Sequence, residues 1–242
     1  MSALAELSEP YGSFMLGPRP GPDVCEVCFD FTRGYKRCRS CSQIENALAA
    51  VAPISYSIGG EQLHQALLGY KRLKGSVARR LERELGAVLW RFLLLHEGCV
   101  ARAGGLDSFE VVTTVPSGDR DRDLDHPMRG MVGELIGPTH DRYQLLLTRS
   151  EADVPPRTAA PEKFRALRHL DGEPVLLIDD TWTTGASAQS AAATLRAAGA
   201  GPVAAVVIGR HLNRDWDEND RRLSALEEQP FDWGRCALCA PH

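Results

Sequence analysis

The sequence of 242 residues lacks any long apolar run. Its longest apolar stretches, such as residues 203–208, fall far short of the ~18 residues that a membrane-spanning helix needs. The N-terminal sequence MSALAELSEP also lacks the basic region and the apolar region of a secretory signal. From these absences we expect a cytoplasmic protein without membrane insertion.

An excess of charge of one sign is absent as well. The chain carries 28 Lys and Arg residues against 32 Asp and Glu residues, so its formal net charge is −4 at pH 7. Bulk electrostatics therefore favour neither a nucleic acid nor a membrane as partner, and any basic binding surface has to be local. With 43% hydrophobic and 25% charged residues, the composition is typical of a globular protein with a substantial core.

Seven cysteines stand out in this ordinary composition, and six of them form Cys-x-x-Cys pairs. In a cytoplasmic chain such pairs indicate metal ligands rather than disulfides. Nine residues separate the first two pairs, which is enough for a zinc ribbon to close a tetrahedral site. The predicted ligands of this structural Zn²⁺ are Cys25, Cys28, Cys38 and Cys41.

The third pair consists of Cys236 and Cys239. It has no place at the same ion, because four thiolates already fill a tetrahedral zinc site. Three interpretations remain open: a second metal site with His242, an exchange with one of the N-terminal pairs, or a simple dithiol. The seventh cysteine, Cys99 in the sequence LLLHEGCV, is expected to be a small buried hydrophobic residue.

Hydrophobic spacing predicts helices in the first half of the chain and mainly strands in the second. From residue 63 onward apolar residues recur at helical spacing, and Gly69 and Gly75 are expected to divide this run into two helices. A further short helix is predicted within residues 42–51, and another at 186–198. Short apolar strands are predicted at residues 54–58, 109–115, 143–148, 174–178 and 203–208. The strand, helix and strand after residue 174 form a βαβ unit, which predicts an α/β fold with a parallel sheet.

The helical run also carries a basic face. Its six residues suit either a solvated surface or a basic wall beside an anionic ligand. They are Lys71, Arg72, Lys74, Arg79, Arg80 and Arg83.

The sequence VLLIDDTWTTGAS, residues 175–187, places two acidic residues at the end of a buried strand. In parallel sheets, ligands bind at the carboxyl ends of strands. The N–H groups at the start of the next helix suit a phosphate, and the carboxylates suit sugar hydroxyls or a hydrated Mg²⁺. The acidic residues are Asp179 and Asp180, and the predicted phosphate-binding residues are Thr183, Thr184, Gly185, Ala186 and Ser187.

This stretch resembles the phosphoribosyl-pyrophosphate (PRPP) signature of type I phosphoribosyltransferases: an apolar run, Asp-Asp, two variable residues, Thr-Thr-Gly, a small residue and a hydroxyl residue. The order of the Cys-x-x-Cys pairs, a YKRLKGSVARRL helix pair and this signature is similar to that of ComF-like (competence protein F) proteins over residues 25–210. The resemblance implies a phosphoribosyltransferase-type core with an N-terminal zinc ribbon and a helical hood. It also implies that the two aspartates take the ribose hydroxyls and that the turn takes the 5-phosphate.

The resemblance further implies a pyrophosphate loop between the helix pair and the signature. Members of the family carry VPVP…RGFNQ there, and this chain matches that segment in part, at Pro116, Ser117, Arg129 and Gly130. Within the loop the aspartates nearly cancel the arginines. The acidic residues are Asp119, Asp121, Asp123 and Asp125, and the basic ones are Arg120, Arg122 and Arg129.

The resulting division of the chain has four parts. It comprises a flexible lead-in (1–24), a zinc-ribbon-like knuckle with a short helix (25–52), a helical hood (53–105), and a phosphoribosyltransferase-like α/β domain with a C-terminal Cys-x-x-Cys tail (106–242).

Transfer of a phosphoribosyl group from PRPP with Mg²⁺ to an amine or nucleobase acceptor, with release of pyrophosphate, is the function that the resemblance implies. Two other classes remain open. The partial match in the middle loop favours a non-catalytic PRPP-binding sensor or assembly factor linked to the competence machinery of DNA uptake. Phe29, Phe31 and Tyr35, next to the arginines of the ribbon, favour an adaptor for single-stranded DNA, although the same aromatic residues would also serve as the core of the ribbon.

Overall fold

A four-stranded parallel sheet forms the centre of the protein. The computed structural model describes residues 3–117, 123 and 126–239. Within them the strand order is β1 (Ala50–Ile58), β6 (Val203–Leu212), β5 (Val175–Trp182) and β2 (Val111–Thr114), and all three pairs are parallel. The mixed α/β class with a parallel sheet is therefore confirmed.

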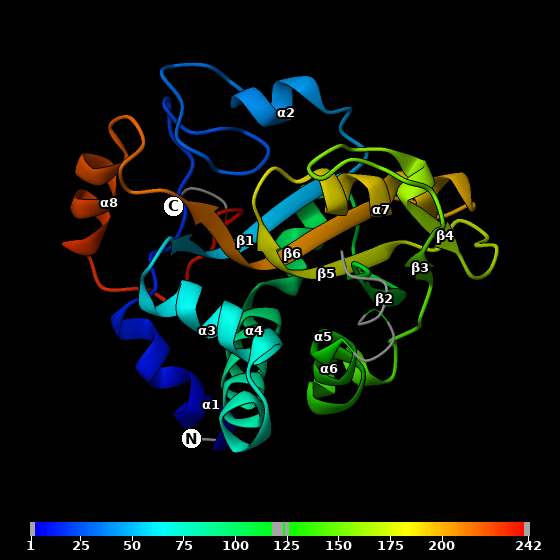
Figure 1. Cartoon of the computed structure of the whole chain (residues 1–242), viewed down its shortest axis with the longest axis horizontal. Coiled ribbons are helices and arrows are strands. Elements are labelled where there is room, and N and C mark those ends of the chain that lie inside the picture. Colours follow the sequence, from blue (N-terminus) through cyan, green and yellow to red (C-terminus); the bar gives the residue numbers. More distant parts are fainter. Residues whose placement is uncertain (1–2, 118–122, 124–125, 240–242) are drawn as a thin grey trace.

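Helices cover both faces of this sheet (Figure 1). Alternate residues of a strand point to opposite faces. Leu176 and Ile178 of β5 accordingly pack with residues of α3 (Gln62–Arg72) and α4 (Gly75–Ala103), whereas Val175 and Leu177 pack with α7 (Ala186–Ala197). Burial on both faces explains why β5 and β6 are continuous apolar runs in the sequence.

The two long helices are separated at Gly75, which has a φ of +74°. Gly69 lies inside α3 instead, at a close approach to α4. A Cβ at this position would lie 2.7 Å from Cδ1 of Leu81. Of the two predicted breaks, the structure therefore has one, and the other glycine allows α3 and α4 to pack closely.

The N-terminal segment is more regular than the predicted flexible lead-in. It forms α1 (Ala3–Ser8) and a 3-10 helix, η1 (Glu9–Ser13), and α1 lies beside α4. Tyr11 and Met15 are buried in the core shared with α4, and the Tyr11 hydroxyl donates a hydrogen bond to Glu84 (3.2 Å). These apolar contacts order a segment that its Pro and Gly content alone marked as irregular.

Two further predictions differ from the structure in position. The short helix expected within residues 42–51 is α2 (Arg39–Gln43), and the chain then extends into β1. Because β1 pairs with β6, residues 50–58 belong to the central sheet and precede the helical hood.

The remaining elements are short. The strand expected at residues 143–148 becomes an isolated parallel bridge from Tyr143 to Val112 and a small antiparallel sheet of β3 and β4. The bounds are α5 (Pro127–Gly130), a π-helical turn η3 (Met131–Leu135), α6 (Gly137–His140), β3 (Leu147–Arg149), a 3-10 turn η4 (Pro161–Lys163), β4 (Phe164–Ala166) and α8 (Asn219–Glu227).

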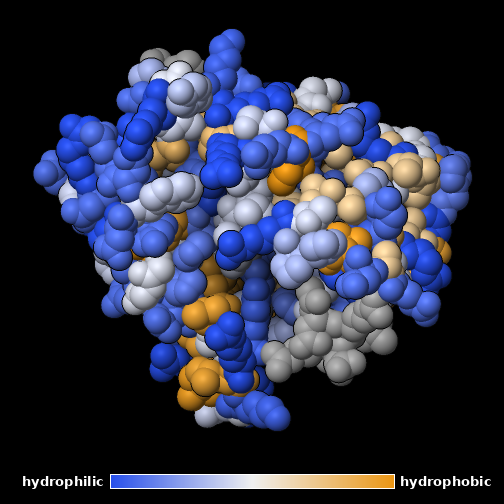
Figure 2. Space-filling view, turned by 45° about the horizontal axis from the view of Figure 1, so that its top comes forward, coloured by the Kyte–Doolittle hydropathy of each residue, from blue (hydrophilic) through white to orange (hydrophobic). Residues whose placement is uncertain are grey.

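Hydrophilic residues cover most of the molecular face in Figure 2, and the hydrophobic residues on it form separate small patches. Scattered apolar side chains are normal on a protein surface and mark no binding face by themselves. In the described part of the chain, no helix combines the length and the apolar character needed to cross a bilayer.

Candidate functional site

The carboxyl-terminal half of β5 carries the two acidic residues of the sequence VLLIDDTWTTGAS. Asp180 is 4% exposed and Asp179 is half-buried. The chain then turns through residues 183–185 into α7. Gly185 has a φ of +83°, and a Cβ there would lie 2.1 Å from the ring of Trp182. A side chain would therefore both clash with Trp182 and strain the backbone, so this turn requires glycine.

Two adjoining cavities lie at this turn. One of about 230 Å³ is formed by the turn and the start of α7. The other, of about 440 Å³, extends to α3 and to Pro116 and Ser117 of the middle loop. Asp179, Thr183 and Ser187 line both cavities, so a carboxylate and the N-terminus of α7 border the same space. Thr184 also lines a larger cavity of about 680 Å³, and neither aspartate lines that cavity.

Asp180 is held by two consecutive residues of α3. The Tyr70 hydroxyl donates a hydrogen bond to its carboxylate, and Nζ of Lys71 lies 2.5 Å from Oδ2. Burial raises the pKa of Asp180, but the charge and hydrogen bond of Lys71, and then the hydrogen bond of Tyr70, bring this pKa below its ordinary value. The predicted hydroxyl acceptor thus stays ionised, and its Oδ2 is engaged by α3.

Asp179 differs from its neighbour in both contacts and ionisation. Its Oδ1 accepts a hydrogen bond from the backbone N–H of Asp180 (2.9 Å). Burial, and next the negative charge of Asp180, raise the pKa of Asp179 to about 7. Near neutral pH this carboxyl is therefore partly protonated, and of the two acidic residues it is the one open to both cavities.

The predicted basic face of the helices divides into two parts. Lys71 lines the larger of the two adjoining cavities, whereas the other five residues are exposed. A solvated surface therefore describes most of this face, and a single lysine reaches the site.

Lys163 is a buried cation that the sequence predictions do not include. It is 6% exposed, and its Nζ donates a hydrogen bond to Oγ of Ser187 (3.0 Å) at the start of α7. Burial lowers the pKa of Lys163, and the charge of nearby Arg149 lowers it further. In Arg149, the buried Nε and Nη1 have no hydrogen-bond partner among the described residues. An anion bound at the turn would therefore meet the ammonium group of Lys163 beside Ser187.

No local pattern in the sequence predicts the contact between Lys163 and Ser187. Lys163 is the last residue of the turn η4, in the sequence PEKF, and it reaches Ser187 because η4 and β4 lie beside α7.

In the middle loop, the carboxylate of Asp123 connects several parts of the chain through hydrogen bonds and an ion pair. This buried carboxylate accepts hydrogen bonds from the backbone N–H groups of Ser117 (2.8 Å) and Arg149 (3.2 Å). It also pairs with Arg129 (2.9 Å). Arg129, one of the predicted pyrophosphate ligands, therefore has a partner within the protein. Gly130 ends α5 next to it, while the predicted Arg120, Arg122, Asp119, Asp121 and Asp125 lie outside the described residues.

Three histidines line the larger of the two adjoining cavities, and none of them is among the sequence predictions. The rings of His64 and His211 lie 4.9 Å apart, and the ring of His126 lies edge-on to that of Tyr70. Burial lowers the pKa of both His126 and His211, so they are neutral near pH 7. Nδ1 of His211 lies 3.1 Å from the Ser57 carbonyl, which assigns the proton to Nδ1 and leaves Nε2 as an acceptor.

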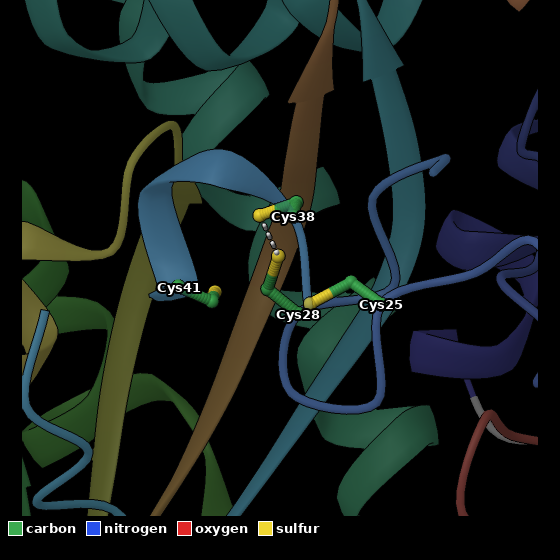
Figure 3. A group of neighbouring side chains, drawn as sticks. All are labelled: Cys25, Cys28, Cys38 and Cys41. Carbon is green, nitrogen blue, oxygen red and sulfur yellow. Dashed lines mark hydrogen bonds between the residues drawn. The ribbon is translucent and has the colours of Figure 1, made fainter. Parts of the chain in front are cut away.

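The four N-terminal cysteines gather as the spacing predicts. Figure 3 shows that their side chains converge, with Cys41 reaching in from α2. All four are buried, their sulfur atoms lie within 4.8 Å of one another, and the sulfurs of Cys28 and Cys38 are 3.7 Å apart. A tetrahedral Zn²⁺ with Zn–S bonds of about 2.3 Å separates its sulfurs by about 3.8 Å. The group could therefore hold a structural metal such as zinc.

The positive charge beside this group comes from a buried arginine of the sheet and not from the surface arginines near the cysteines. Arg33 and Arg37 pair with Asp217 and Glu26 on the surface. Arg210 of β6 is buried instead. Burial lowers the pKa of Arg210, but the charges of Cys28 and Asp30 outweigh this effect and raise it. Arg210 also donates to the carbonyl of Trp182 (3.4 Å), so it links the ribbon to the end of β5.

The aromatic residues of the ribbon are mostly core residues. Phe29 is 4% exposed, and the ring of Phe31 packs at 5.3 Å from that of Tyr56. Tyr35 is 70% exposed. Of the three candidates for stacking on bases, the structure leaves Tyr35 on the surface.

The third Cys-x-x-Cys pair lies beside α4, in a group separate from the N-terminal one. Cys236 and Cys239 meet His96 and Cys99 there, so the pair does not exchange with an N-terminal knuckle. The expectation for Cys99 is wrong in part: the residue is half-exposed and has thiol and imidazole neighbours. His242, the ligand that one interpretation required, lies outside the described residues.

The sequence contains one signal for this group. His-x-x-Cys in LLLHEGCV places both side chains on one face of a helix.

A comparison with models of known protein families finds no match for the chain, and a comparison with curated proteins finds none either.

Proposed function

We propose that the protein binds PRPP together with Mg²⁺ and transfers its phosphoribosyl group to an amine or nucleobase acceptor, as a ComF-like phosphoribosyltransferase. One observation carries this proposal: Asp179 and the glycine turn before α7 border the same two cavities. A phosphorylated sugar needs an anion site and a hydroxyl-accepting carboxylate that border the same space.

In this proposal the N–H groups of the turn and Lys163 bind the 5-phosphate, since Lys163 already donates to Ser187. Asp179 accepts a ribose hydroxyl in its ionised form. Asp179 is also the carboxylate with room for a hydrated Mg²⁺, because Lys71 and Tyr70 engage Oδ2 of Asp180. Mg²⁺ would neutralise charge on the leaving pyrophosphate.

The chemistry left to the protein is orientation, exclusion of water and removal of a proton from the acceptor. Displacement of pyrophosphate builds positive charge on the ribose ring, and ionised Asp180 lies nearby to favour it. We assign the removal of the acceptor's proton to His211, because its Nε2 is free to accept a proton at the wall of the cavity.

Calorimetric titration with PRPP and Mg²⁺ tests the binding part. Asp179→Asn removes one charge-assisted hydrogen bond, on the order of 1.5–3 kcal/mol, so it should weaken binding roughly ten- to a hundredfold. The matched control is Asp171→Asn, at a side chain that is 92% exposed, and it should bind as the wild type does. Absence of binding by the wild type at millimolar PRPP, or equal binding by Asp179→Asn, would overturn the proposal.

PRPP binding without transfer is a second candidate, and the ion pair between Arg129 and Asp123 favours it. An arginine already paired with a buried carboxylate is a weaker ligand for pyrophosphate. Pyrophosphate release measured across a panel of amines and nucleobases separates the two candidates. Release with one acceptor supports the enzyme, and tight binding without release supports a sensor.

A further inference from the structure

We propose that His96, Cys99, Cys236 and Cys239 bind a second zinc ion, which fastens the C-terminal segment to α4. The four ligand atoms lie within 4.8 Å of one another, although Cys99 and Cys239 are 140 residues apart in the chain. His96 and Cys99 come from successive turns of one face of α4, and Cys236 and Cys239 come from a turn at the end of the described chain.

The distances within this group match a tetrahedral site. The sulfur of Cys239 lies 3.5 Å from that of Cys236 and 3.9 Å from that of Cys99. Nδ1 of His96 lies 3.7 Å from the Cys239 sulfur and 3.9 Å from the Cys99 sulfur. Tetrahedral zinc separates thiolate ligands by about 3.8 Å, whereas a disulfide would bring two sulfurs to about 2.05 Å. A plain dithiol would not explain why an imidazole and a third thiol complete the shell.

The surrounding groups orient the ligands. Nε2 of His96 lies 2.8 Å from the carbonyl of Trp233, so Nε2 carries the proton and Nδ1 presents its lone pair to the sulfurs. Such a hydrogen bond from the second ring nitrogen is typical of histidines that bind metals. The backbone N–H of Cys236 donates to the sulfur of Cys239 (3.2 Å).

The net charge of the proposed site is small. Three thiolates and one Zn²⁺ sum to −1, and Arg102 donates to the sulfur of Cys99 (3.4 Å) from the next turn of α4. The site is also less enclosed than the N-terminal group, because Cys99 and Cys239 are half-exposed.

A metal at this position would hold an irregular segment of the chain in place. Residues 228–239 contain neither helix nor strand. The other contacts of this segment with the body include the guanidinium of Arg91 stacked 4.3 Å from the Trp233 ring and a hydrogen bond from Arg19 to the Arg235 carbonyl (3.3 Å). Zinc would therefore add a direct link between α4 and the C-terminal segment to these contacts.

Metal content is the first test. Elemental analysis of the full chain should give two zinc ions per molecule, and Cys236→Ser with Cys239→Ser should reduce this to one. His96→Gln should lower the zinc content as well, whereas the control His169→Gln, at an exposed histidine, should keep both ions. A wild type with one zinc ion or none, or a double variant that retains two, would overturn the proposal.

The second test uses the wild-type chain and so does not depend on the folding of a variant. Iodoacetamide labelling is mapped to each cysteine by mass spectrometry before and after treatment with a zinc chelator. Bound zinc should protect the half-exposed Cys99 and Cys239, and the chelator should increase their labelling rate at least tenfold. An unchanged rate at Cys99 would refute zinc ligation there.

Discussion

The contact between α3 and Asp180 leads to a quantitative prediction about stability. Asp180 is 4% exposed, and its side chain is paired with Lys71, whose own side chain is 31% exposed. Loss of one partner from a fully buried pair costs about 3–5 kcal/mol, because the remaining charge stays buried and unpaired. Since Lys71 keeps part of its hydration, we expect Lys71→Met to lower the free energy of unfolding by about 2–3 kcal/mol.

A double-mutant cycle isolates this interaction. In the combined variant Lys71→Met with Asp180→Asn, no charge remains unpaired, so the two single losses should not add. We expect a coupling free energy of about 2 kcal/mol from urea unfolding of the zinc-loaded protein at pH 7.5. The matched control is the exposed pair of Arg221 and Glu218, with side chains 76% and 56% exposed, where the coupling should be about 0.3 kcal/mol. Additive losses at Lys71 and Asp180, within about 0.5 kcal/mol, would refute the role assigned to this pair.

Three further predictions concern the ligand site. Gly185→Ala should abolish PRPP binding, because the new Cβ would lie 2.1 Å from the Trp182 ring. The control Gly172→Ala has a φ of +89° but no atom within 4 Å of the new Cβ. It therefore measures the backbone cost alone, about 1–2 kcal/mol of unfolding free energy. PRPP affinity should rise as the pH increases from 6 to 8, because the ionised form of Asp179, with its pKa of about 7, accepts the ligand hydroxyl, and the rise should disappear in Asp179→Asn. Lys163→Met should weaken binding of PRPP and of ribose 5-phosphate alike, by roughly tenfold or more, in the same titration.

Each of these predictions has a result that contradicts it. Equal PRPP affinity in Gly185→Ala and the wild type would show that the turn does not contact the phosphate. A flat or falling pH profile would mean that the carboxyl of Asp179 does not act in its ionised form. If ribose 5-phosphate bound to Lys163→Met as tightly as to the wild type, the proposed phosphate site would be wrong. The control is Lys74→Met, at an exposed lysine, which should bind as the wild type does.

Local spacing in the sequence determined a large part of this fold. The apolar runs at 174–178 and 203–208 with a helix between them predicted the parallel unit of β5, α7 and β6. The same reasoning predicted the gathering of the first four cysteines. It also predicted a strand that ends just before Asp179, whereas β5 continues to Trp182 and Asp179 lies in its carboxyl-terminal half. These features depend on neighbours within about forty residues, and strand alternation, helix periodicity and ribbon spacing all act over that range.

The lead-in shows where composition misleads. The Pro-rich and Gly-rich end of residues 1–24, GPRPGPDV, predicted a flexible lead-in, yet Tyr11 and Met15 pack into the core beside α4. Burial of two large side chains outweighs weak local preferences, and the surface that receives them belongs to a helix about seventy residues further along the chain.

The tertiary structure alone decided the partners of the charged and metal-binding groups. Tyr70 and Lys71 reach Asp180 across 110 residues of chain, and Lys163 meets Ser187 because β4 lies beside α7. The spacing of His96 and Cys99 fits one face of a helix, and that of Cys236 and Cys239 fits one turn, but no local spacing shows that the two pairs meet. Periodicity specifies which side chains share a face of one element, whereas packing between elements specifies which faces come together, and this information is spread over the whole core.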